Sequence, residues 1–457
     1  MIPRSLLARN AQQAIRRSRG ASSLQSRGFA AAVGTGAFDT ADVSGLKVAS
    51  RDAHGPTTKL AVVAKGGTRY QPLPGLTVGL EEFAFKNTQR RSALRITRES
   101  ELLGGQLAAS HTREALVLEA SFLRNDLPYF AELLAEVVSM TKYTTHEFHE
   151  DIERVLPLKQ AALRDNVSAL ALDNAHAVAF HTGLGAPIYP SLSTPHQKYL
   201  NEEFIASYAD VVYSKSNIAV VADGAPSDKL LKWVGQFFKD VPPSSQSGQS
   251  LIIEASKYHG GEQRIEHAGG NSMVIAFPGS DSNGSKPEMA VLASLLGGKP
   301  TVKWAPGFSL LSKASAGLAG FSATTSNISY SDAGLLAVQL SGPASSVRRV
   351  AEETVKALKS IADGSVGKET VAKAIVNAKF NALEKAQLRG ASMLLAGSGL
   401  VNNGKALELA ALASGIESVT ADKLCKAAKA ILDGKATVST VGDLFVLPYA
   451  EEIGLRV

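Results

Sequence analysis

Cysteine is almost absent from this chain: among 457 residues only Cys425 carries a thiol, inside a helix predicted over residues 421–432. A single cysteine cannot form an intrachain disulfide, which excludes a disulfide-stabilised scaffold and fits a reducing compartment. Its neighbours, Leu424 and Lys426, supply no histidine base, so we interpret Cys425 as a packed, inert thiol. The cysteine and histidine set that holds an iron–sulfur cluster is also missing, and we predict no cofactor.

Long apolar runs and an excess of one charge are missing from the body of the chain. No uninterrupted apolar stretch approaches the ~20 residues that span a bilayer, so we expect membrane association only through partners. The net charge of +6 comes from six arginines before Asp39, and without them 42 basic residues face 42 acidic ones. A nearly neutral body argues against nucleic-acid binding, which needs basic residues clustered on a folded face.

The segment that carries those arginines predicts a mitochondrial transit peptide and flexible leader over residues 1–38. It is rich in arginine and serine, has no acidic residue before Asp39, and places Leu6, Leu7 and Ile15 at spacings compatible with an amphipathic helix. It lacks the continuous apolar core of a secretory signal. The alternative interpretation is a disordered basic tail that binds an acidic partner.

The body reads as two halves with the same order of elements. A polar tract over residues 242–250 predicts a linker between domains at 39–241 and 251–457. Strands predicted at 59–64 and 272–277 begin the two halves, and later pairs keep a nearly fixed offset: Leu116 and Leu335 are 219 residues apart, and Asp223 and Asp443 are 220 apart. This repetition indicates internal duplication. Each half predicts an α+β domain, a largely antiparallel sheet covered by helices.

Residues 75–88 read Gly-Leu-Thr-Val-Gly-Leu-Glu-Glu-Phe-Ala-Phe-Lys-Asn-Thr, like a zinc-binding helix without its histidines. The inverted zinc motif H-x-x-E-H places two imidazoles one turn apart, with a glutamate between them that activates water. Glu81 stands where that glutamate belongs, but Val78 and Glu82 occupy the ligand positions. Valine offers no lone pair, and the carboxylates alone cannot rebuild a three-ligand catalytic zinc site. We predict no metal ligand and no catalytic residue here.

Further motifs lie at residues 66–70 (Gly-Gly-Thr-Arg-Tyr), 183–190 (Gly-Leu-Gly-Ala-Pro-Ile-Tyr-Pro) and 330–335 (Tyr-Ser-Asp-Ala-Gly-Leu). Together with residues 75–88, they resemble the pitrilysin-type (M16) metallopeptidase family, most closely its core-protein branch in the mitochondrial cytochrome bc1 complex. The resemblance covers essentially the whole chain after the leader. In active relatives a glutamate in the next long helix completes the zinc site, and family spacing puts that position near Gln160. A neutral amide is a poor zinc ligand.

The resemblance implies a non-catalytic structural subunit of ubiquinol–cytochrome c reductase, peripheral on the matrix side of the mitochondrial inner membrane. Its implied partners are core protein 1, cytochrome b, cytochrome c1, the Rieske protein and the small subunits of that complex. The rival function within the family is the non-catalytic α-type subunit of the mitochondrial processing peptidase, which binds presequences with a long glycine-rich loop. Residues 297–301 form only a thin version of such a loop, which favours the respiratory subunit.

The histidines elsewhere give weaker signals. His146 and His149 lie one turn apart at the start of a helical stretch predicted over residues 144–171, with Thr144 and Glu147 as a possible capping box. No third ligand is placed by the sequence, so we interpret these histidines as part of a solvated helix start. We interpret His111, in a predicted strand, as a packing or surface histidine.

Overall fold

The computed structural model describes residues 37–52, 54–190, 199–282, 286–298, 300, 307–406 and 409–457. The transit-peptide prediction therefore lies, apart from its last two residues, outside the described residues. Within the described ranges, no helix combines the length and apolarity that crossing a bilayer requires.

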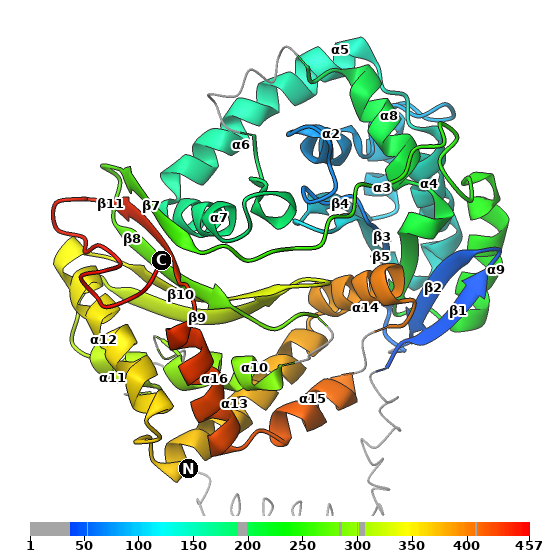
Figure 1. The fold of residues 1–457 in the computed structure, drawn as a ribbon. Helices are drawn as coiled ribbons and strands as arrows, with labels where there is room; N and C mark the ends of the chain where they lie inside the picture. The colour runs from blue at the N-terminus through cyan, green and yellow to red at the C-terminus, as the bar shows by residue number, and fades with distance from the viewer. Residues whose placement is uncertain are drawn as a thin grey trace, which may run out of the picture. The chain divides into compact units, whose positions relative to one another are not determined.

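The first half contains a six-stranded sheet in the order β1-β2-β6-β3-β5-β4 (Figure 1). Neighbouring strands are antiparallel except β2 and β6, which run parallel. The strands are β1 (Asp39–Val43), β2 (Leu46–Arg51), β3 (Thr57–Ala64), β4 (Gln106–His111), β5 (Leu116–Leu123) and β6 (Ile218–Asp223).

The second half repeats this plan with one strand fewer. Its five-stranded sheet has the order β7-β11-β8-β10-β9, and again a single pair, β7 and β11, is parallel. The strands are β7 (Gly261–Glu266), β8 (Ser272–Pro278), β9 (Ser322–Ser329), β10 (Gly334–Ser341) and β11 (Thr437–Gly442). The predicted α+β class and the predicted strands at 59–64 and 272–277 are confirmed.

Each half also contains helices of its own, most of which pack into the same hydrophobic core as its sheet. In the first half these are α2 (Leu76–Phe83), α3 (Ala93–Leu102), α4 (Leu127–Met140), α5 (Thr145–Glu147), α6 (Glu153–Asp165), α8 (Glu202–Val212) and α9 (Ser227–Phe237). In the second half they are α10 (Pro287–Leu296), α11 (Leu310–Ala314), α12 (Ala344–Ala362), α13 (Lys368–Gln387), α15 (Leu409–Glu417) and α16 (Ala421–Asp433), the last carrying the partly exposed free thiol of Cys425. Short helical turns occupy Arg124–Asp126, Gly183–Gly185, Lys215–Asn217 and Phe238–Asp240.

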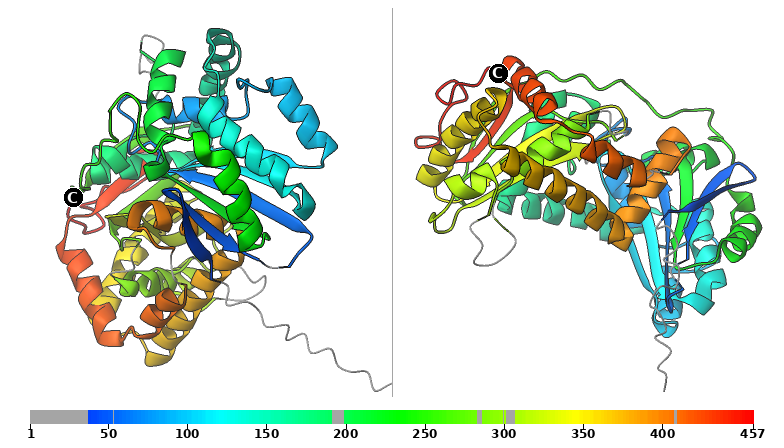
Figure 2. Two further views of the ribbon diagram at one scale, coloured as in Figure 1. Left: turned by 90° about the vertical axis from the view of Figure 1, so that its right-hand side faces the viewer. Right: turned by 90° about the horizontal axis from the view of Figure 1, so that it is seen from below.

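The other face of each sheet is covered by a helix from the opposite half. Alternate strand residues point to opposite faces, so Leu60 and Val62 join the core of the first half while Ala61 and Val63 face the other way. There α14 (Arg389–Asn403) packs on β6, β3 and β2. Figure 2 shows this helix in orange against strands of the first sheet.

The exchange is reciprocal. Helix α7 (Val167–Phe180) lies on β11, β8 and β7, and small residues one turn apart, Ala171, Ala175 and Ala179, let it approach the second sheet closely.

Two details of the helical stretch predicted over residues 144–171 are wrong. It is divided into α5, a π-helical turn at Phe148–Ile152, α6 and the start of α7, with Asn166 capping α7 through the amide of Ala169. The capping box does not form, because Thr144 donates its hydroxyl to the Glu147 carboxylate (2.6 Å) and Glu147 accepts from the amide of Asn87 (3.0 Å).

Residues 241–260, which connect the short turn ending at Asp240 to β7, contain no helix or strand. The domain boundaries at 242–250 stay a prediction.

Candidate functional site at the degenerate zinc motif

Helix α2 carries the residues of the degenerate zinc motif. It starts after Gly75, whose backbone is left-handed (φ 99°), a conformation that glycine adopts without steric cost. Val78 is completely buried and belongs to the core of the first half. The position predicted for the first lost ligand is thus a packing position, whereas Glu81 and Glu82 lie partly exposed in the last turn.

A lysine ammonium joins the two carboxylates of α2. Lys159, on α6, places its Nζ 2.9 Å from Glu81 Oε1 and also contacts Glu82 Oε1. The ring of Tyr189 lies 5.8 Å from the same Nζ. A single ammonium group thus connects α6 with α2, the helix that carries the degenerate motif.

His111, at the end of β4, supports the same group. Its Nδ1 contacts Glu81 Oε2, and its Nε2 lies 3.2 Å from the carbonyl of Ile188. The ring packs edge-to-face on Tyr189, with centroids 5.6 Å apart. Because both ring nitrogens face oxygens, neither directs a lone pair to an open position. The structure confirms His111 as a packing histidine, although its contact with Glu81 was not predicted.

These contacts keep Glu81 and Lys159 charged. Burial would raise the pKa of Glu81, but hydrogen bonds and charge from His111 and Lys159 outweigh it and hold that pKa below its usual value. Burial would lower the pKa of Lys159, but its bonds to Glu82 and Glu81 raise it above the ordinary value. Glu81 is therefore a charged partner in an ion cluster rather than a general base poised near neutral pH.

Gln160 follows Lys159 on α6 and is buried. Its Nε2 donates to the carbonyl of Pro190, whereas its Oε1 accepts no hydrogen bond from any described residue. The amide thus fixes the segment at residues 188–190, which His111 also holds. The assignment of Gln160 to the third ligand position remains a prediction.

The donor set does not fit a catalytic zinc ion. Such a site needs three nitrogen, oxygen or sulfur ligands and an open position. Here Val78 has no donor atom, Gln160 offers a neutral amide, and Glu82 is engaged by the Lys159 ammonium. Across the part of the chain that the structure describes, no group of three histidine, cysteine, aspartate or glutamate side chains is arranged to hold a metal.

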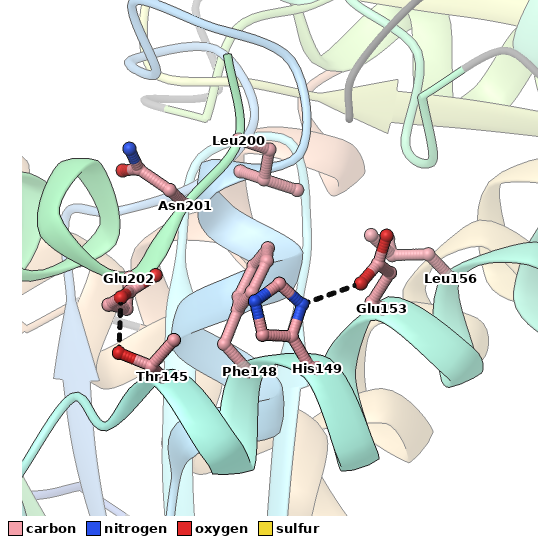
Figure 3. A pocket seen from close by; sticks show the side chains of 8 residues that line it. All are labelled: Thr145, Phe148, His149, Glu153, Leu156, Leu200, Asn201 and Glu202. Carbon is pink, nitrogen blue, oxygen red and sulfur yellow. Dashed lines mark hydrogen bonds and ion pairs between the residues drawn. The ribbon is translucent and has the colours of Figure 1, made fainter. Parts of the chain in front are cut away.

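His149 lies in a separate small pocket of about 180 Å³ (Figure 3). Its Nδ1 pairs with Glu153 Oε2 at 2.8 Å, while Glu202 accepts the hydroxyl hydrogen of Thr145 at 2.6 Å. Figure 3 shows Phe148 beside the imidazole and the two carboxylates on different sides of the pocket. The pocket is below the ~300 Å³ typical of small-molecule sites, and its polar groups already have partners.

The motifs at residues 66–70 and 330–335 meet at the junction of the two halves. Arg69 forms a bidentate pair with Asp332 (2.7 and 2.6 Å) and also bonds Glu114 (2.6 Å). It donates to the carbonyl of Glu254, and Ser256 donates to Asp332 through its amide and hydroxyl. These motifs therefore form a structural link rather than a reaction centre.

Comparison with known proteins gives a consistent result. Residues 47–191 match the family described as insulinase (peptidase family M16), and residues 199–377 match the peptidase M16 inactive domain. A protein named cytochrome b-c1 complex subunit 2, mitochondrial, from Neurospora crassa is 58% identical over the full length of both chains. Its namesake in Schizosaccharomyces pombe is 36% identical over 90% of this chain and 94% of its own, and that of Mus musculus is 26% identical over 90% of each.

Proposed function

The chain belongs to the cytochrome b-c1 complex subunit 2 family of M16 peptidase homologues, and from that premise we propose that it is a non-catalytic structural core subunit of mitochondrial ubiquinol–cytochrome c reductase, complex III. The full-length identity of 58% to a relative of that name carries the proposal. The chemistry of α2 supports it, because a buried valine and an ammonium-bound carboxylate stand at the two positions that we assign to the family's zinc ligands.

The task we infer for this subunit is mechanical: it supports assembly and stability of a complex whose redox chemistry resides in other subunits. We propose core protein 1, cytochrome b, cytochrome c1, the Rieske protein and the small subunits as its partners. The proposed location is the matrix side of the inner membrane, reached after removal of a transit peptide that lies within residues 1–38, with membrane association through those partners. The proposed domains remain 39–241 and 251–457, joined by 242–250.

Purification of the tagged full-length chain from mitochondria in mild detergent tests this function. We expect it to co-purify with cytochromes b and c1, detected by their haem absorbance, and with a second core subunit. Amino-terminal sequencing of the recovered chain should show that the leader has been removed. Recovery with a zinc-containing peptidase partner but without cytochromes would instead support the α-type processing-peptidase subunit. In that case the glycine-rich segment at 297–301 would be the first region to mutate; Lys299 and residues 301–306 lie outside the described residues.

A further inference from the structure

The two carboxylates of α2 share a cation supplied by the chain itself. Lys159 contacts both Glu81 and Glu82, and the three side chains retain 23%, 13% and 22% of their exposure. Lys86, which follows α2 in the chain, pairs instead with the single carboxylate of Asp151 at 2.6 Å. The Lys159 ammonium therefore lies between two negative charges, a position that favours a positive ion.

We propose that Lys159 is a resident cation that excludes divalent metal ions from the Glu81–Glu82 carboxylate pair. This inference rests on the proposed non-catalytic function and deepens it, because it names the side chain that keeps the degenerate site metal-free. Loss of the nitrogen ligand at position 78 removes the preference for zinc. Carboxylate oxygens still suit harder divalent cations, so keeping those ions out requires another feature of the chain.

Electrostatics explains how a lysine performs this exclusion. The ammonium is tethered to α6, so it has far less translational entropy to lose on pairing than a free ion has. A second cation placed between the same carboxylates would meet the ammonium at close range in a partly desolvated region, where charge interactions are stronger than in water. A divalent ion therefore binds only after Lys159 leaves.

Two neighbouring residues bear on what remains once the ammonium is removed. Gln160, the next residue on α6, has a buried Oε1 that accepts no hydrogen bond from the described residues. His111 holds one oxygen of Glu81 in place. Replacing Lys159 by a neutral side chain thus leaves the Glu81 carboxylate held by His111 and the Glu82 carboxylate beside it on α2. Carboxylate oxygens are donors of the type that Mn²⁺ accepts.

The test compares Mn²⁺ binding by the full-length wild-type chain and by Lys159→Met, followed through the electron paramagnetic resonance signal of free Mn²⁺ at pH 8. We expect at least tenfold tighter binding by Lys159→Met than by wild type. The double variant Lys159→Met with Glu82→Gln should lose this gain. The matched control Lys86→Met, which removes a lysine from a single carboxylate nearby, should leave Mn²⁺ binding unchanged.

Several outcomes would overturn the inference. Binding by Lys159→Met that equals wild type, an equal gain in Lys86→Met, or a wild-type site that already binds Mn²⁺ through Glu82 would each do so. If Lys159→Met does not fold, Lys159→Gln, with Lys159→Arg as the charged control, decides the question by the same measurement. Failure here with intact co-purification of cytochromes overturns only the inference, whereas zinc-dependent peptide cleavage by the wild type would overturn the proposed function.

Discussion

Arg69 provides the most direct test of how the two halves are held together. Its side chain is 3% exposed and bonds Asp332, Glu114 and the Glu254 carbonyl. Replacing Arg69 by Met keeps much of the apolar stem but removes every one of these bonds. Two carboxylates then remain at the junction without their cation.

The expected cost follows from the burial of the group. Removing one partner of a buried ion pair costs about 3–5 kcal/mol, because the remaining charge stays desolvated. The side chain of Asp332 is 34% exposed, and Ser256 continues to donate to it, so solvent screening reduces its share. We therefore expect Arg69→Met to lower the free energy of unfolding by about 3 kcal/mol, at the lower end of that range.

A double-mutant cycle with Asp332→Asn isolates the link itself. Urea unfolding followed by circular dichroism should give a coupling energy of about 1–2 kcal/mol between the two substitutions. The matched control is Arg348→Met, since Arg348 is 44% exposed and pairs with Glu452 at 2.9 Å on the surface. That variant should lose less than about 1 kcal/mol.

The stability contributed by the Arg69–Asp332 pair should also fall in acid. Burial would raise the pKa of Asp332, but its bonds to Arg69 and Ser256 outweigh this and hold the pKa below 3.8. The contribution of Asp332 is therefore fully present above pH 3.8 and is lost as the pH falls below that value. Equal unfolding curves for wild type and Arg69→Met, or additive effects of Arg69→Met and Asp332→Asn, would refute the reasoning.

Two further predictions concern the exchanged helices. Burial and the charge of Arg113 lower the pKa of His176 on α7 to about 3. The free energy of unfolding should therefore fall as the pH drops from about 6.5 towards 3, by up to ~1.4 kcal/mol per pH unit. Acid titration of His176→Gln should show a weaker pH dependence, and an unchanged slope would contradict this prediction. On α14, a Cβ at Gly397 would lie 2.5 Å from Val63 Cγ2, so Gly397→Ala should destabilise the chain by about 1–3 kcal/mol. Thermal melts should show partial rescue by Val63→Ala, and full additivity would show that the two residues do not collide.

The sheets could be predicted from the sequence because their signals are local. Apolar residues fill consecutive positions from Leu60 to Val63, which indicates a strand buried on both faces. The same pattern says nothing about which helix covers the second face. Helix α7 contacts its own half and the opposite sheet, and its sequence is apolar on several sides, so periodicity alone could not assign its partner.

Only part of the degenerate site could be predicted from the sequence, because its contacts join residues that are far apart along the chain. The absence of lone pairs at Val78 follows from the residue type, and no structure is needed to see it. The contacts of Glu81 with His111 and Lys159 cross 30 and 78 residues of sequence, and neither has a spacing signal. The predicted third ligand position lies near Gln160, whereas Lys159, one position earlier, is the residue that contacts Glu81 and Glu82.

The retained glutamate of the zinc motif therefore has an explanation that does not involve catalysis. A partly buried Glu81 without a cation would be costly, and in a site without a metal ion either loss of the carboxylate or supply of another positive charge removes that cost. This chain has the second arrangement, since Lys159 bonds both carboxylates and His111 bonds one of them. Glu81 then connects α2, α6 and β4, and replacing it would leave Lys159 with a single carboxylate. A glutamate at this position is therefore explained by the ion cluster that it forms, and its presence alone does not indicate catalysis.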